Sequence, residues 1–309
     1  MTCYVGIDVH KDSLMAWAEG KATSLKNTKT DIRRYLKSLP QGSLIGVETT
    51  SDYHFLFAEE AVAAGFTVYA LNPVDCARYR LALKGRGKTD KIDAEMIARF
   101  VEKEHDSMRP FTLLPKEIRR LRQLLKRRDK VAGLKASLEQ TLSSDPKTKK
   151  MAAKALRELD RLIAELERDI EQLVKGLDGH EFIDSIPGVG LLNTACALSA
   201  LGAGEFRSAD AFVAFAGLDC RPRESGASVG RRVISRRGDR LMRKLLYLAA
   251  LSAKGHAAWK PFYTRHLAKG LSKTQAVVAL ARKIARTIWS VYTHRTPFEL
   301  ERIYSQKMT

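Results

Sequence analysis

The first third of the chain alternates short apolar runs with stretches of helical periodicity, and this pattern restricts the fold more than any other feature. Four runs have strand length and are bounded by Gly, Asp or Asn-Pro: Cys3–Val9, Ser13–Ala18, Leu44–Val47 and Phe66–Leu71. Between them, Thr30–Leu39 and Tyr53–Ala64 have helical periodicity, with Thr30 and either Ser51 or Asp52 available as N-caps. The order β-β-β-α-β-α-β predicts a mixed sheet covered by helices, an α/β architecture.

Two further helices are predicted after the last of these strands. A short helical stretch follows Asn72-Pro73, and a second helix runs from about Thr89 to Glu104. The loop Gly85-Arg86-Gly87-Lys88 lies between them. This α/β region is predicted to end near residue 112.

Leucine and isoleucine recur at steps of three and four in the middle third. The first series is Ile118, Leu121, Leu125, Ala132, Leu138 and Leu142, and the second is Leu159, Leu162, Leu166, Ile170, Leu173 and Leu177. Ser143-Ser144-Asp145-Pro146 separates them as a helix breaker. Residues 113–180 are therefore predicted to form either a helical hairpin or an intermolecular coiled coil. The segment is either a spacer between domains or a dimerisation arm, and we favour oligomerisation.

Residues 181–309 are predicted to form a mostly α domain. Helices are expected at Leu191–Leu201 and at about Ala209–Ala216, Asp239–Ala253 and Thr274–Tyr292. Ile186-Pro187-Gly188-Val189-Gly190 is similar to the hairpin of a helix-hairpin-helix unit, in which backbone N–H groups approach a phosphate. An ordinary tight turn before the next helix explains the same residues.

The positive charge of the chain is concentrated at its end. There are 54 Lys and Arg against 35 Asp and Glu, a formal net charge of +19. Residues 1–112 carry +1 and residues 113–218 carry +3, whereas residues 219–309 hold 20 basic and 5 acidic residues. An excess of this kind indicates a polyanionic partner, usually nucleic acid. A merely solvated basic face is the alternative.

Several classes of protein are excluded by composition. Hydrophobic residues make up 45% and charged residues 29%, which is typical of a globular chain. No apolar run approaches the ~20 residues of a membrane span, and the first residues lack the pattern of a secretion signal. The four cysteines are scattered, so we expect buried thiols at Cys3, Cys76 and Cys196, no zinc site and a reducing, cytoplasmic compartment.

Four acidic residues of the first third differ from ordinary surface charges. Asp8 and Glu48 each end an apolar strand, where an acid is costly to bury without a partner. Asp90 and Asp93 are three residues apart at the start of a predicted helix, so they share one face. If this helix packs across the two strands, the four carboxylates converge. Taken one at a time, Asp90 is better explained as a helix N-terminal acid that the helix dipole favours, and Asp8 as a turn residue at a strand end.

A convergent set of carboxylates needs a cation. Mg²⁺ or Mn²⁺ is the natural choice for oxygen ligands, and a pair of such metals ~3.5–4 Å apart can clamp a phosphodiester and activate the attacking oxygen. We therefore predict that Asp8, Glu48, Asp90 and Asp93 are both catalytic and metal-binding.

These acids lie in motifs that identify a family. Gly6-Ile7-Asp8, Glu48-Thr49-Thr50-Ser51-Asp52-Tyr53 and Lys88-Thr89-Asp90-Lys91-Ile92-Asp93-Ala94 resemble the DEDD motifs of insertion-sequence transposases. This family has a RuvC-like, ribonuclease H-like N-terminal domain and is related to the pilin-gene-inverting recombinase. The likeness covers nearly the whole chain. It implies a RuvC-like mixed-sheet domain, a helical coiled-coil linker and a mostly α transposase domain.

A serine in the basic region is a candidate nucleophile. Arg221–Ser228 is a small-residue loop between arginines, and without a His-Asp partner nearby Ser225 reads as a turn or phosphate-binding serine. The resemblance implies more, because Glu224–Ser228 matches the family's Glu-Ser-Gly-x-Ser segment and places its catalytic serine at Ser225. Ser225 would then attack DNA and form a phosphoserine intermediate, while Ser228 and Ser235 would contact phosphate.

Basic residues follow this loop closely and predict contacts to the nucleic-acid backbone. The predicted nucleic-acid-binding set is Lys88, Arg221, Arg223, Ser228, Arg231, Arg232, Arg236, Arg237 and Arg240. The helix that begins at Gly238-Asp239 is expected to turn Leu241, Leu245 and Leu248 inward. Trp259, Tyr263 and Trp289 could stack on bases, but core packing is the expectation for each.

The resemblance implies a DNA transposase that cuts and rejoins the double-stranded donor and target DNA of a mobile element. It also implies a structured guide RNA and a dimeric or tetrameric assembly. One alternative is a structure-selective nuclease that uses metal-activated water. A catalytically silent nucleic-acid-binding protein is a third reading, against which the intact set of acids argues because acids repel phosphate.

Overall fold

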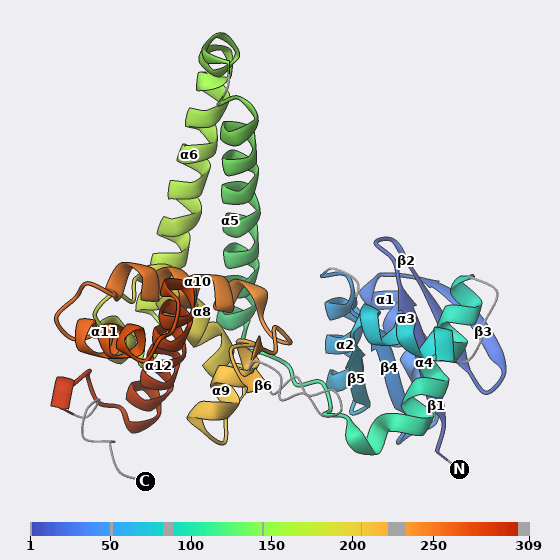
Figure 1. Cartoon of the computed structure of the whole chain (residues 1–309). Coiled ribbons are helices and arrows are strands. Elements are labelled where there is room, and N and C mark those ends of the chain that lie inside the picture. The colour runs from blue at the N-terminus through green and yellow to red at the C-terminus, as the bar shows by residue number, and fades with distance from the viewer. Residues whose placement is uncertain are drawn as a thin grey trace. The chain divides into compact units, whose positions relative to one another are not determined.

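The computed structural model describes residues 2–49, 52–82, 89–143, 145–204, 206–221 and 233–301. The chain divides into two compact units, Met1–Leu113 and Leu114–Thr309, each described here by itself (Figure 1). Across the described ranges, no helix combines the length and the apolar character needed to cross a membrane.

A five-stranded sheet forms the centre of the first unit, in the order β3-β2-β1-β4-β5. Its strands are β1 (Tyr4–Val9), β2 (Ser13–Ala18), β3 (Lys21–Lys26), β4 (Leu44–Glu48) and β5 (Thr67–Leu71). The pairs β1–β2 and β2–β3 are antiparallel, whereas β1–β4 and β4–β5 are parallel. The predicted mixed sheet and the predicted order of elements along the chain are confirmed, and β3 is the strand for which no residue range was predicted.

The helices of the first unit lie close to their predicted ranges. They are α1 (Lys29–Lys37), α2 (His54–Ala63), α3 (Pro73–Ala82), α4 (Asp90–Glu104) and the short 3₁₀ helix η1 (His105–Ser107). The predicted N-cap of the first helix is wrong, because the side chain of Thr28, not Thr30, accepts a hydrogen bond from the Asp31 N–H. The α2 N-cap is Tyr53, without a side-chain hydrogen bond, so Asp52 is not the cap.

The two faces of the sheet are covered differently. Ile7 and Val47 share a buried cluster with Ile32 of α1 and Phe57 of α2. The opposite face lies against α4 at two glycines, and a Cβ on Gly6 would lie 1.9 Å from the backbone oxygen of Ala94. A Cβ on Gly46 would lie 2.5 Å from a side-chain methyl of Val101. The α4 backbone can therefore approach the sheet only where glycine leaves room.

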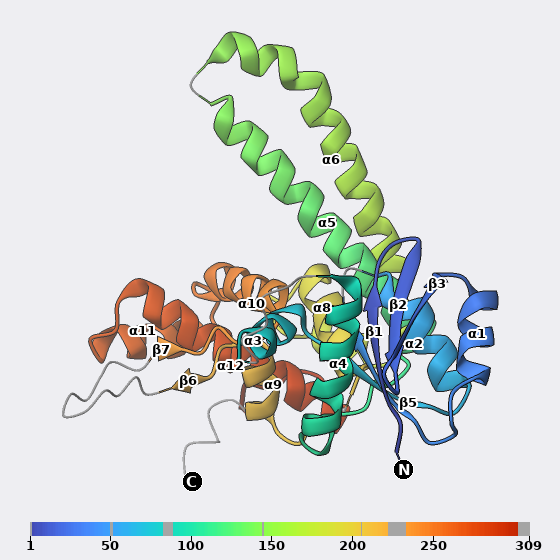
Figure 2. The ribbon, with the colours of Figure 1, turned by 90° about the vertical axis from the view of Figure 1, so that its right-hand side faces the viewer.

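Two long helices begin the second unit and form an antiparallel hairpin (Figure 2). They are α5 (Lys116–Thr141) and α6 (Pro146–Lys175), with Asp145 as the N-cap of α6. Arg128 lies 2.6 Å from Glu167, and Lys135 lies 2.6 Å from Asp160. The predicted break near Pro146 is confirmed. Within one chain this segment folds as a helical hairpin, one of its two predicted forms.

The remaining elements of the second unit pack around the base of this hairpin. They are α7 (His180–Asp184), α8 (Leu191–Leu201), α9 (Ala209–Phe215), β6 (Cys220–Arg221), β7 (Val233–Ile234), α10 (Arg240–Ala253), α11 (Lys260–Ala268) and α12 (Lys273–His294). Leu121 of α5 and Ile170 of α6 are fully buried in the same core as these helices. The helices α7 and α11 and the short β6–β7 ribbon had no counterpart among the predicted elements.

Two side-chain predictions for this unit have clear outcomes. Leu248 is 46% exposed and does not face the core as predicted, because Met242, Leu245 and Ala249 form the buried side of α10. Trp259 is fully buried, and its indole Nε1 donates a hydrogen bond to the Pro187 carbonyl oxygen at 2.8 Å, which confirms its core role.

The Ile186–Gly190 segment forms a turn packed against α10. Gly188 has φ +85°, and a Cβ there would lie 2.5 Å from the Ala253 Cβ. Close packing therefore accounts for this glycine, and a turn here agrees with both the tight-turn and the hairpin interpretations. The three cysteines expected to be buried thiols are buried, and Cys220 is exposed.

Candidate active site

Two parallel strands place the first two acids side by side. Ile7 of β1 pairs with Val47 of β4, so Asp8 and Glu48 are the next residues at the adjacent strand ends. Side chains alternate along a strand, and each acid follows a glycine by two residues. Asp8 and Glu48 are therefore on the face of the sheet against which α4 packs.

The first turn of α4 supplies the second pair of acids. Thr89 caps the helix by accepting a hydrogen bond from the Ile92 N–H at 3.3 Å. Asp90 and Asp93 follow in this turn, with Asp90 exposed and Asp93 only 5% exposed. Because the helix crosses the sheet at Gly6 and Gly46, its N-terminal turn brings these carboxylates toward Asp8.

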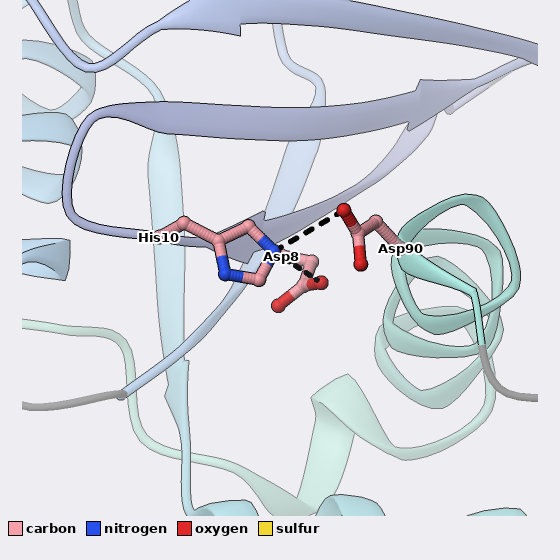
Figure 3. A group of neighbouring side chains, drawn as sticks. All are labelled: Asp8, His10 and Asp90. Carbon is pink, nitrogen blue, oxygen red and sulfur yellow. Dashed lines mark ion pairs between the residues drawn. The ribbon is translucent and has the colours of Figure 1, made fainter.

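His10 connects two of the acids (Figure 3). Its Nε2 lies 3.4 Å from a carboxylate oxygen of Asp8 and 3.4 Å from one of Asp90. One ligand atom from each of these three residues lies within 4.8 Å of the others, which is a spacing suited to a metal ion. The sequence analysis missed His10, although its place two residues after Asp8, at a strand end, was a usable signal.

The electrostatics of Asp8 show that the acids repel one another. Burial raises the pKa of the Asp8 carboxyl most, and the neighbouring Asp93 and Asp90 raise it further. His10 and a hydrogen bond from the Val9 backbone lower the same pKa, without offsetting burial. A cation between these carboxylates would relieve both the desolvation and the repulsion.

Asp93 has a cationic partner of its own. The Arg80 guanidinium of α3 lies 2.7 Å from the Asp93 carboxylate, and the side chain of Asp93 is 7% exposed. A buried carboxylate requires such a partner to remain ionised. Nothing in the spacing of the motifs pointed to Arg80, because its role depends on the packing of α3 against α4.

Glu48 lies outside the group formed by Asp8, His10 and Asp90. It is near Cys76 of α3, whose thiol pKa is raised to about 12, first by burial and then by Glu48. Asp8 raises the pKa of the same thiol to a smaller extent. The structure thus brings Asp8 and Asp90 together with His10, holds Asp93 against Arg80, and leaves Glu48 at the neighbouring strand end.

Most predicted residues of the basic domain lie outside the described residues. These are Ser225, Ser228, Arg223, Arg231 and Arg232, and Lys88 of the first unit is another. Arg221 ends β6, and its side chain is likewise outside the description. Arg236, Arg237 and Arg240 are exposed and follow β7 closely.

The base of the ribbon β6–β7 is held by polar contacts. Cys220 pairs with Ile234 in the ribbon. The Ser235 hydroxyl donates a hydrogen bond to the Asp219 carboxylate, and the Arg237 N–H donates to the Ser235 oxygen at 3.3 Å. Asp239 then caps α10 by accepting from the Met242 N–H. Ser235 thus has a structural partner in place of a free hydroxyl.

Comparison with known proteins identifies two transposase families along the chain. Residues 5–144 match a DEDD transposase family of the IS110 type, and residues 180–265 match the family described as Transposase IS116/IS110/IS902. The first match contains all four predicted acids, and the second contains Ser225.

Relatives with curated names agree with these matches. The pilin gene-inverting protein of Moraxella bovis is 25% identical over 96% of this chain and 97% of its own length. A probable family 20 transposase of Pseudomonas aeruginosa is 28% identical over 87% of this chain and 89% of its own. An IS900 protein of Mycobacterium paratuberculosis is 35% identical over 45% of this chain and 36% of its own. The two family matches and the names of these relatives therefore support a DNA transposase or recombinase of the IS110 type.

Proposed function

We propose that the chain cuts and rejoins the DNA of an insertion sequence by means of a serine nucleophile and a divalent-metal carboxylate site. The single observation that carries the metal part is the group of Asp8, His10 and Asp90, whose ligand atoms lie within 4.8 Å of one another. The two family matches support the DNA substrate. The protein would act in the cytoplasm, at the nucleoid.

The four acids would hold the metal ion. Asp8 and Asp90 would supply carboxylate oxygens, Asp93 and Glu48 would complete the set, and such ligands suit Mg²⁺ or Mn²⁺. An imidazole ligand from His10 would favour Mn²⁺ over Mg²⁺. When bound, the metal would stabilise negative charge on the phosphodiester and lower the pKa of the attacking hydroxyl.

Ser225 would perform the covalent step. Its hydroxyl oxygen would bond to the phosphorus of the scissile phosphodiester, and the bond from phosphorus to one sugar oxygen would break. The serine proton would leave with the departing sugar hydroxyl. A second DNA hydroxyl would then attack the phosphoserine, which restores the serine and joins the new strands without loss of phosphodiester energy.

Basic side chains would hold the nucleic-acid backbone. Arg236, Arg237 and Arg240 are exposed beside the β6–β7 ribbon. A second cationic group lies on α11 and α12, where burial first and then Arg286 and Arg265 lower the pKa of Lys283. Residues 240–298 contain no Asp or Glu. A polyanion would relieve the repulsion among these charges.

A structured guide RNA and a homo-oligomer complete the proposal. The RNA would pair with donor and target DNA, so that the protein need not read their sequence by itself. The α5–α6 hairpin supports oligomerisation because Leu134 and Met151, in the half of the hairpin farthest from the core, are 52% and 78% exposed. Two protomers, each with one serine and one carboxylate site, would make a dimer, and two such dimers would make a tetramer.

The test is a cleavage assay with end-labelled donor DNA, the co-purified RNA and Mg²⁺. We expect the wild-type protein to form a covalent adduct that survives denaturation, and Ser225→Ala to bind nucleic acid without forming it. Ser228→Ala is the comparison: as the loss of a phosphate contact it should weaken nucleic-acid binding but still form the adduct. An adduct that persists in Ser225→Ala would refute the serine assignment.

The same assay separates the alternatives. A nuclease that uses water would cleave normally as Ser225→Ala and fail as Asp8→Asn. A silent binding protein would bind equally with all four acids replaced by amides and would show no metal dependence. Sequencing of co-purified RNA tests the guide, because reproducible recovery of one structured RNA is expected and its absence contradicts the guided mechanism.

A further inference from the structure

The acidic site contains two basic side chains of the protein itself, and they differ in how they meet the carboxylates. His10 lies at the open side and its side chain is 48% exposed. Arg80 lies deeper, with a side chain that is 22% exposed against a carboxylate that is 7% exposed. Water cannot easily take the place of either partner in the deeper pair, because both charges have lost most of their hydration.

The Arg80–Asp93 pair is close but poorly aligned. Nη2 of Arg80 lies 2.7 Å from Oδ1 of Asp93, yet this Oδ1 has no partner with hydrogen-bond geometry. Nε of Arg80 is also buried without a hydrogen-bond partner. Buried polar groups in native proteins nearly always find a partner, so two such atoms in one ion pair need an explanation. A carboxylate oxygen that keeps unused acceptor capacity is suited to a second cation.

We propose that Arg80 is a built-in counter-cation that competes with the metal ion for the Asp93 carboxylate and thereby sets the metal affinity of the site. The inference rests on the proposed function, since it requires that the acids bind a divalent cation. Arg80 stabilises Asp93 while the metal is absent. Metal binding to the same oxygen must displace the guanidinium or bring two positive charges close together, and either event weakens binding.

Another ion pair on the same helix provides a matched control. Arg99 lies 2.8 Å from Glu95 in α4, as an i,i+4 pair whose side chains are 56% and 31% exposed. Replacing Arg99 removes one positive charge and one ion pair to an α4 carboxylate, as replacing Arg80 of α3 does, but at a solvated position. A difference between the two variants therefore reports the buried position and not the net charge of the protein.

The experiment measures Mn²⁺ binding to the full-length, chelator-treated protein by titration calorimetry without nucleic acid. We expect Arg80→Gln to lower the Kd for Mn²⁺ by roughly tenfold, Arg80→Lys to change it less, and Arg99→Gln to leave it unchanged. An unchanged or higher Kd in Arg80→Gln, with a wild-type protein that binds Mn²⁺, overturns the inference and leaves the proposed metal site intact. If neither protein binds Mn²⁺, both the metal site and the inference are wrong.

A second measurement, thermal unfolding with and without Mn²⁺, tests the inference even if the variant is less stable than the wild type. Because Arg80→Gln leaves Asp93 buried without a counter-charge, the metal-free variant should melt below the wild type. Saturating Mn²⁺ should then raise Tm more in Arg80→Gln than in the wild type, since binding free energy adds to folding free energy. An equal or smaller rise in the variant contradicts the competition.

Discussion

The substitution Gly6→Ala tests whether the close approach of α4 to the sheet builds the acidic site. The new Cβ would lie 1.9 Å from the Ala94 carbonyl oxygen and 2.5 Å from the Ala98 nitrogen, both backbone atoms of α4. Ordinary contact begins near 3.4 Å, so the helix must retreat by roughly 1.5 Å, since backbone atoms cannot rotate away as a side chain can.

Overpacking of this kind costs about 1–3 kcal/mol. For a unit of this size we expect Tm to fall by roughly 5–15 °C. Gly46→Ala should cost less, because its nearest neighbours are side-chain methyl groups of Val101 and Ile97 that can shift. Gly133→Ala is the control: it lies within α5 with nothing within 4 Å, so removing the glycine should stabilise the helix by about 0.5–1 kcal/mol.

The assay is thermal unfolding followed by circular dichroism, together with Mn²⁺ titration. The retreat of α4 moves Asp90 and Asp93 away from Asp8, so Gly6→Ala should also bind Mn²⁺ at least tenfold more weakly, whereas Gly133→Ala should bind it normally. The reasoning is refuted if Gly6→Ala melts with the wild type, or if it melts lower but keeps its full affinity for metal.

Three further outcomes are expected. Burial raises the folded-state pKa of Asp8, so the metal-free protein should lose stability as pH rises from the ordinary Asp pKa through the raised value. Asp8→Asn should remove this pH-dependent loss, and melting curves recorded at several pH values measure it. Leu245→Glu should destabilise by on the order of 3–5 kcal/mol in denaturant titrations because it buries an unpaired charge, whereas Leu248→Glu should change little because that side chain is 46% exposed. Replacing Arg236 and Arg237 with Gln should lower the slope of log affinity against log salt by about 0.9 for each lost phosphate contact on duplex DNA, as measured by fluorescence anisotropy.

The elements were predictable where local pattern and tertiary packing agree. The apolar strand runs and the leucine spacing of α5 and α6 predicted the type of each element, since the strands are buried and both helices bury their apolar residues at the base of the hairpin. Disagreement arose at Leu248, which continues a helical apolar pattern but faces outward. The apolar pattern alone cannot say which side of α10 meets the core when Met242 and Ala249 compete with Leu241 and Leu248 for the buried side.

The acids of the candidate site were predictable, and their cationic partners were not. An acid at the end of an apolar strand is costly wherever the strand packs, so Asp8 and Glu48 stood out in the sequence alone. Lys and Arg are common on any surface, and a single Arg in a short helix carries no signal. Arg80 gains its role only when α3 packs against α4 and places the guanidinium beside Asp93.

The two-residue spacing from a glycine to an acid, found in both β1 and β4, links the fold to the candidate site. Gly6 and Asp8 on β1 repeat as Gly46 and Glu48 on β4, at the same register in the sheet. Gly6 leaves room for the α4 backbone and Gly46 for side chains of α4, and alternation of side chains then places the acid on that same face, beyond the helix contact. A larger residue at either glycine would move the helix that carries Asp90 and Asp93. Packing of the first unit and convergence of its acids are therefore one structural requirement, and a substitution that relaxes the packing must also loosen the site.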